Sequence, residues 1–194
     1  MEKLTVEQLF GLEQYARRRH EFRAQVMAHR DRRRVAVGPN MAWCFEDRLT
    51  IQYQVQELLR AARVFEPQRI QDELEVCNPL IPDGTNWKAT LLVEFPDSAQ
   101  RHRQLALLRG VERRCWVRVS GFEQVFAIPA LHSPREHEAQ TATVHSLRFE
   151  LGRPLIAALR AGAELDAGAD HEHYRYAVEP VAERTRASLL GDLA

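Results

Sequence analysis

Two histidines near the end of the chain have the spacing of a metal-binding pair. His171 and His173 lie within the run DHEHY at positions 170–174. In an extended segment, residues two apart point to the same side, so both imidazoles can reach one ion. The carboxylates of Asp170 and Glu172 favour such a site. The same spacing is common by chance, and a polar surface turn is the alternative interpretation.

A second set of polar residues falls where the surrounding pattern predicts burial. This set consists of Glu46, Glu57, Glu73, Glu94, His145 and His171. Buried carboxylates are costly unless an arginine neutralises them or a metal ion binds them, and iron, manganese and zinc accept mixed oxygen and nitrogen ligands. One alternative is therefore a divalent metal site with the ligands Glu57, Glu94, His145 and His171. The other is neutralisation by Arg60, Arg63 and Arg148.

No strong catalytic signature accompanies these residues. The sequence contains no GxSxG, HExxH, phosphate-binding loop or GxGxxG. Spacing alone therefore assigns no nucleophile, general base or orienting group, and enzymatic activity stays an open question.

Arginines dominate the polar face of a long amphipathic helix that we expect near the N-terminus. Thr5 and Gln8 form a capping box, and apolar residues recur at near-helical spacing to about position 29. Arginines follow at positions 17–19 and 23 and in the run at 30–34. They predict either a docking surface for an acidic partner or an ordinary solvated face.

The elements that must position these side chains alternate between helices and strands. Helical periodicity or capping predicts further helices over about 51–62, 67–77, 97–110 and 154–161. Alternating apolar residues predict strands over 35–45, 88–95, 115–119, 124–128 and 143–151, several of them joined as hairpins. Because there is no regular βαβ alternation, we expect an α+β fold with a mixed or mainly antiparallel sheet.

Length and composition limit the class of protein. A chain of 194 residues is long enough for one well-packed domain, with an N-terminal helix over 1–31 and an α/β body over 32–194. The 27 basic and 27 acidic residues give zero net charge, which makes nucleic-acid binding an unfavoured function. Three separated cysteines fit neither a disulfide framework nor a zinc site.

Location and oligomeric state follow from the apolar pattern. No apolar run approaches the roughly 20 residues of a membrane span, and the N-terminus lacks the plan of a signal peptide. We therefore expect a cytoplasmic protein without a membrane partner. The long first helix has more apolar length than a small sheet readily covers, so a homodimer is plausible.

The sequence also resembles a known bacterial family. The motifs that carry the resemblance are RRRVAVGPNMAWCFEDRLTIQYQVQELLRAARV, IQDELEVCNPLIP, KATLLVEF, TVHSLRFEL and DHEHY, which together extend over nearly the whole chain. They are similar to the family of domains of unknown function numbered 3501. The chain departs from the family pattern at Cys77, where an aromatic residue is usual, and at Glu172, where a proline usually follows the histidine.

The resemblance implies a functional context and a set of residues. Genes of this family often lie near those of rubrerythrin-like proteins and iron–sulfur oxidoreductase subunits, which implies a role in redox metabolism or oxidative stress and a redox protein as partner. Besides His145 and His171, the residues that match the family motifs are the candidates for a polar central pocket: Glu46, Gln54, Glu57, Arg60, Glu73, Asn78, Glu94, Arg148 and Tyr174.

Three functions remain open from the sequence. The leading hypothesis is an accessory or binding protein of a redox system, built around this pocket. The second is a metal-dependent enzyme that uses the glutamate and histidine site. The third is an interaction module that docks an acidic partner through its arginine-rich helix.

Overall fold

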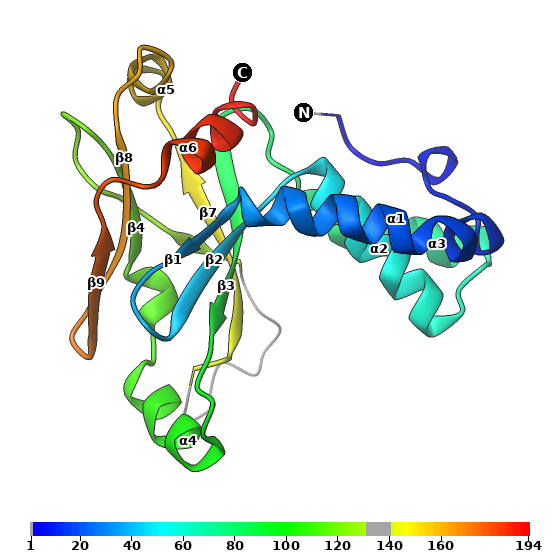
Figure 1. Cartoon of the computed structure of the whole chain (residues 1–194), viewed down its shortest axis with the longest axis horizontal. Helices are drawn as coiled ribbons and strands as arrows, with labels where there is room; N and C mark the ends of the chain where they lie inside the picture. The colour runs from blue at the N-terminus through cyan, green and yellow to red at the C-terminus, as the bar shows by residue number, and fades with distance from the viewer. Residues whose placement is uncertain (1, 131–140) are drawn as a thin grey trace.

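The protein consists of a β-sheet body and a helical arm that extends to one side of it (Figure 1). This computed structural model describes residues 2–130 and 141–194. Three helices, α1, α2 and α3, lie together in the arm, and two antiparallel sheets form the body. The α+β class predicted from the sequence is confirmed.

The larger sheet contains five strands in the order β1-β2-β3-β7-β6. Its strands are β1 (Arg34–Ala36), β2 (Met41–Glu46), β3 (Asn86–Val93), β7 (Val144–Glu150) and β6 (Ile128–Pro129). All pairings are antiparallel, and the register sets Trp43 opposite Leu91, which in turn lies opposite His145.

The smaller sheet contains four strands in the order β5-β4-β8-β9. They are β5 (Val125–Phe126), β4 (Cys115–Val119), β8 (Leu165–His171) and β9 (Tyr174–Val178). The predicted hairpin of β4 and β5 is present, and the chain then crosses to the larger sheet at β6.

One apolar core fills the space between the two sheets. Alternate residues of each strand point into it, as expected for sheets that are covered on one face. The larger sheet contributes aromatic rings, including those of Trp43, Phe45 and Phe149, whereas the smaller sheet contributes mainly small side chains such as Val117 and Ala167. The body is therefore a β-sandwich.

Strand β8 was not predicted from the sequence. Its outward positions carry Asp166, Gly168 and Asp170, which are poor strand-forming residues. Gly168 is required by packing, because a Cβ there would lie 2.4 Å from the ring of Trp116. A tertiary contact thus overrides the local preference of the segment.

The arm is built from α1 (Leu12–Asp31), α2 (Arg48–Ala62) and α3 (Pro67–Cys77). Asp47 caps α2 by accepting a hydrogen bond of 2.9 Å from the backbone N–H of Thr50. The arm therefore includes two helices beyond the appendage predicted over 1–31, because α2 and α3 pack beside α1 and away from the sheets.

The first helix begins later than the sequence predicts. Thr5 and Gln8 cap only a short 3₁₀ turn, η1 (Val6–Gln8), and α1 starts at Leu12. The side chain of Gln56 holds the intervening chain by bonding both the N–H and the C=O of Phe10, at 2.6 and 3.2 Å.

The remaining elements are short. They are α4 (Ser98–Leu107), α5 (Arg153–Arg160), α6 (Glu183–Leu190), η2 (Asn78–Leu80) and η3 (Val111–Arg113). Helix α6 lies beside the base of the arm (Figure 1). Across residues 2–130 and 141–194, no helix has both the length and the apolar composition needed to cross a bilayer.

The apolar face of α1 is covered by another helix of the same chain. Helix α1 packs against α2, so that Tyr15, Phe22 and Val26 are buried within the single chain. Its apolar length is therefore covered without a second copy, and the homodimer stays a prediction that gel filtration can test.

Candidate functional site

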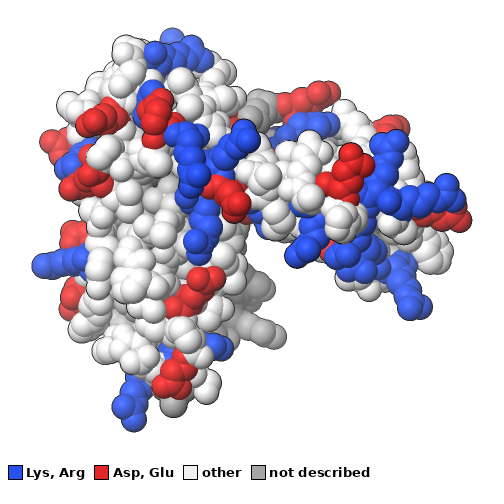
Figure 2. All heavy atoms as spheres, in the orientation of Figure 1, with Lys and Arg blue, Asp and Glu red and all other residues white. Residues whose placement is uncertain are grey.

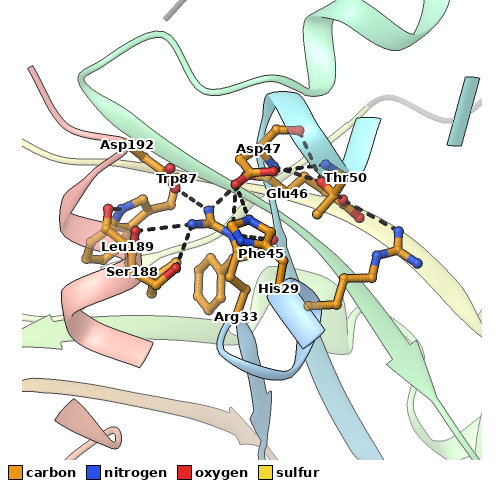
Figure 3. Close-up of polar contacts among 11 residues, drawn as sticks. His29, Arg33, Phe45, Glu46, Asp47, Thr50, Trp87, Ser188, Leu189 and Asp192 are labelled. Carbon is orange, nitrogen blue, oxygen red and sulfur yellow. Dashed lines mark hydrogen bonds and ion pairs between the residues drawn. The ribbon is translucent and has the colours of Figure 1, made fainter. Parts of the chain in front are cut away.

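Arg33 is the centre of a buried polar network where the arm meets the body (Figure 3). This residue follows the end of α1 and is only 1% exposed. It donates hydrogen bonds to the C=O groups of Phe45 and Glu46 at 3.0 and 3.2 Å, and to the C=O and hydroxyl of Ser188, both at 3.2 Å. It also pairs with the carboxylate of Asp192. Arg33 thus connects β2 with the C-terminal segment.

Two aspartates lie on either side of this guanidinium. Burial raises the pKa of Asp192 to about 6, although Arg33 opposes the rise. Burial also acts to raise the pKa of Asp47, but the charge of Arg33, the N–H of Thr50 and the His29 imidazole outweigh it, so that this pKa lies below its ordinary value. The His29 Nε2 atom is 2.5 Å from Asp47 Oδ2.

Glu46 extends the network along β2. It is 3% exposed, and its two carboxylate oxygens accept hydrogen bonds from the hydroxyls of Thr50 at 2.5 Å and Thr90 at 2.7 Å. Its nearest cation is Arg30, at 3.8 Å. The carboxylate is therefore satisfied mainly by neutral donors, as a buried acid must be when its ion pair is long.

A second polar cluster holds α1 against α2 within the arm. Glu57 receives two hydrogen bonds from Arg19, at 2.7 and 2.8 Å, and one of 2.7 Å from the hydroxyl of Tyr15. The hydrogen bonds from Arg19 and then Tyr15 lower the pKa of Glu57 to about 2, although burial acts to raise it. Burial and then Glu57 raise the pKa of Tyr15. This carboxylate is committed to holding the helices together.

An apolar groove of about 710 Å³ lies where the start of α1 meets α2 and α3. Its lining is mainly aliphatic and aromatic, with Glu13, Gln14, Arg17 and Arg18 as the polar members. The Arg18 guanidinium lies over the ring of Phe10, 5.5 Å from its centroid. The full lining is Val6, Leu9, Phe10, Gly11, Leu12, Glu13, Gln14, Arg17, Arg18, Leu59, Val64, Phe65 and Ile70.

Charge is distributed differently over the two parts of the molecule. On the face shown in Figure 2, basic side chains gather over the arm, while the body carries scattered charges of both signs. The rim of the groove has cations that are open to solvent, since the side chain of Arg17 is 82% exposed and its contact with Glu13 is 3.9 Å. Such an exposed pair contributes little and leaves the arginine open to a partner.

The structure does not bring the four predicted metal ligands together. Glu57 lies in the arm, whereas Glu94 follows β3 with a side chain that is 62% exposed. His145 begins β7, where its Nε2 lies 2.9 Å from Thr141 Oγ1, and His171 ends β8. Among residues 2–130 and 141–194, no group of three or more His, Cys, Asp or Glu side chains could hold a metal ion.

The predicted histidine pair lies at a hairpin turn between β8 and β9. The rings of His171 and His173 have centroids 5.9 Å apart. Both ring nitrogens of His171 are engaged by the backbone, Nε2 with Arg109 O at 3.0 Å and Nδ1 with the N–H of His173 at 3.2 Å. The His171 ring therefore helps to hold the turn.

The remaining candidates for a polar pocket also lie apart. Arg60 is the one that meets a predicted partner, Glu57, at 3.4 Å. Asn78 bonds both backbone groups of Leu4 and holds the N-terminal segment. Gln54 on α2 and Glu73 on α3 are half-buried. Arg148 pairs with Glu150 on the outer face of β7, and Tyr174 is buried between the sheets.

Several residues of the junction were not predicted from the sequence. Asp192 had a usable signal, since a carboxylate within LLGDLA lies among apolar neighbours. Asp47 with Thr50 three residues later had the spacing of a helix cap. Arg33 had none, because nothing in the run at 30–34 distinguishes the one arginine that folding buries.

Comparison with known proteins places the chain in a family but assigns no activity to it. No curated protein is significantly similar to this chain. A crystal structure of a novel protein of unknown function from Burkholderia pseudomallei K96243 is 42% identical in sequence, with a TM-score of 0.94 over 100% of both chains. A family model described as a protein of unknown function, DUF3501, matches residues 3–193. With nearly its whole length matched, the chain belongs to the DUF3501 family.

Proposed function

We propose that this protein is an accessory binding protein that docks a partner on its helical arm. The observation that carries the proposal is the apolar groove at the start of α1, with Arg17 and Arg18 at its rim. A groove of about 710 Å³ is large enough for a few side chains of a partner segment.

The chemistry of the groove selects the kind of partner. Its aliphatic and aromatic floor gains free energy by burying apolar side chains, while the two arginines attract carboxylates at the edge. Phe65, whose surface is 68% exposed, offers a further apolar contact. An amphipathic helix with acidic residues beside its apolar stripe meets both requirements, in the helix-in-groove mode.

The sequence resemblance supplies a physiological class for this partner. Rubrerythrin-like and iron–sulfur proteins, the expected redox context, are the first to search for acidic amphipathic segments. The polar central pocket is not part of this proposal, because its predicted residues lie in separate places.

Binding of a labelled model peptide tests the proposal. The probe is a synthetic amphipathic helix with Leu on one face and Glu beside it, followed by fluorescence anisotropy. We expect the wild-type protein to bind it, and Arg17→Glu/Arg18→Glu to weaken binding by about 10-fold or more, since like charges would then face each other. Arg19 is left intact, because it holds Glu57 and reversing it would damage the arm.

Two controls make the result specific. Arg103→Glu reverses an exposed arginine on α4 in the body and should bind the peptide like the wild type. A peptide of the same composition with a scrambled order, and therefore no apolar face, should bind weakly to every variant. Equal affinity of the wild type for the ordered and scrambled peptides would reject the groove as a docking site.

A further inference from the structure

The polar network at the base of the arm contains more negative than positive charge. Its three carboxylates belong to Glu46, Asp47 and Asp192, and its two guanidiniums to Arg30 and Arg33. Among the carboxylates and guanidiniums alone, the sum is one negative charge. The carboxylates of the cluster are largely enclosed, as Glu46 and Asp192 are each 3% exposed.

An enclosed cluster with a net charge can be neutralised by binding one proton. Leaving a charge uncompensated in a low-dielectric interior is costly, and ionisable groups there change protonation state instead. Glu46 is held by two hydroxyls, and Asp47 by His29 and a helix N–H. Asp192 is paired with Arg33, which it shares with Asp47, and of the three carboxylates its side chain has the fewest hydrogen-bond donors in the described part of the chain.

Three charged groups act on the carboxylate of Asp192. Arg33 and His29 approach from the end of α1, and Asp47 approaches from the start of α2. The opposing effects of these charges leave burial dominant, which is why the pKa of Asp192 is raised to about 6 from its ordinary 3.8.

The same cluster attaches the C-terminal segment, residues 183–194, to the rest of the protein. Arg33 bonds Ser188 as well as Asp192, and the indole N–H of Trp87 donates to Leu189 O at 2.9 Å. In Figure 3 these contacts converge from α6, β3 and the end of α1. Detaching the segment would expose Asp192 to water and return it to ordinary acidity.

We propose that the base of the arm is a proton-linked clamp, in which binding of one proton by the cluster favours the attached state of the C-terminal segment. A state that binds a proton more tightly is favoured as pH falls, so mild acid closes the clamp and higher pH loosens it. The clamp is independent of the groove and of any partner that docks there.

Hydrogen exchange of the intact protein measures the clamp directly. We expect the equilibrium constant for opening of residues 183–194 to fall by about fourfold from pH 7.5 to pH 5.5, after correction for intrinsic exchange rates. The expected change follows from the difference between the pKa of Asp192 in the attached segment and its ordinary pKa in water. Asp192→Asn, which is neutral at both pH values, should lose this dependence. Asp166→Asn is the matched control, an enclosed aspartate paired with Arg118 in the smaller sheet, and should keep it.

A measurement on the wild-type protein covers the case in which the variant does not fold. Carbon-13 NMR of the aspartate and glutamate carboxyl groups should show one carboxyl of the cluster titrating between pH 5 and pH 7. The proposal is overturned if no group in the cluster takes up a proton in this range, or if exchange at 183–194 has the same pH dependence in wild type and Asp192→Asn.

Discussion

The body and the arm are stabilised in different ways. The body encloses one continuous apolar core to which both sheets contribute. The arm has two smaller clusters, one around Ile51, Val55 and Leu59 and one around Tyr15, Phe22 and Val26. Polar contacts tie the arm together, above all those of Glu57 and Gln56 with α1 and the residues before it.

This difference indicates which part of the molecule can adapt. A large shared core makes unfolding of the body cooperative, because removing any strand exposes the apolar face of its neighbours. The arm depends on fewer apolar contacts and can open locally at lower cost. A docking groove on the arm therefore lies on the part of the protein that can adjust to a partner.

The largest expected effect is a loss of stability on replacing a phenylalanine of the body, in contrast to one of the arm. Phe149→Ala should reduce the free energy of unfolding by about 3–5 kcal/mol, since the ring is lost from a packed core. That ring is fully buried, 5.5 Å from Trp43 between centroids. Urea unfolding followed by tryptophan fluorescence measures the change.

Phe65→Ala is the matched substitution in the arm. The side chain is 68% exposed, so its loss should change the free energy of unfolding by no more than about 0.5 kcal/mol. The same substitution should weaken binding of the peptide probe. Similar destabilisation by both substitutions would contradict the contrast between body and arm.

An intermediate effect is expected at the polar tie of the arm. Glu57→Gln should destabilise α1 and α2 by about 1–3 kcal/mol, because Arg19 loses its charged acceptor. Hydrogen exchange should increase over Leu12–Asp31 and leave the body strands unchanged. Glu75→Gln on the exposed face of α3 is the control, and a uniform increase across both parts would disprove a local role.

The pH dependence of this tie has a defined direction. The pKa of Glu57 is about 2 in the folded arm against an ordinary 4.5, so its contribution is complete above pH 4.5 and is lost as pH falls toward 2. The difference in arm exchange between the wild type and Glu57→Gln should therefore shrink over this acidic range. If the difference in exchange stayed constant with pH, the effect of the substitution would come from altered packing and not from the lost charge.

The smallest effect is expected where the two sheets meet at one edge. The Tyr174 hydroxyl donates to Val37 O at 2.7 Å and accepts from the N–H of Asn40 at 3.0 Å. Tyr174→Phe should cost about 0.5–1.5 kcal/mol in thermal or urea unfolding. Tyr176→Phe, on the exposed neighbour whose ring packs 4.6 Å away, should be neutral, and equal losses would remove the role assigned to the buried hydroxyl.

Much of the fold could be predicted because local signals agreed with tertiary demands. The apolar stripe of α2 and the strand alternation of β7 each indicated one buried face, and the structure has them. The C-terminal hairpin was hidden, since β8 carries Asp166, Gly168 and Asp170. Only tertiary contacts make these positions suitable, namely those of Asp166 with Arg118, Gly168 with Trp116 and Asp170 with Arg114.

The candidate site was less predictable. Glu46 and Glu57 were recognised as carboxylates in costly positions; Glu46 is buried and Glu57 half-buried, and each has several donors. Their distribution between two separate clusters could not be foreseen, because periodicity gives the face of an element and not the element that it meets.

Local patterns were enough to predict the α+β class and the positions of most helices and strands, because propensity, capping and periodicity act over a few residues, and sequence motifs were enough to indicate the family. Tertiary structure decided which of the neighbouring arginines is buried, and it brought Arg33 to Asp192, 159 residues away. It also formed the groove from three helical segments. Contacts between distant residues depend on how whole elements pack, and no local pattern records that packing.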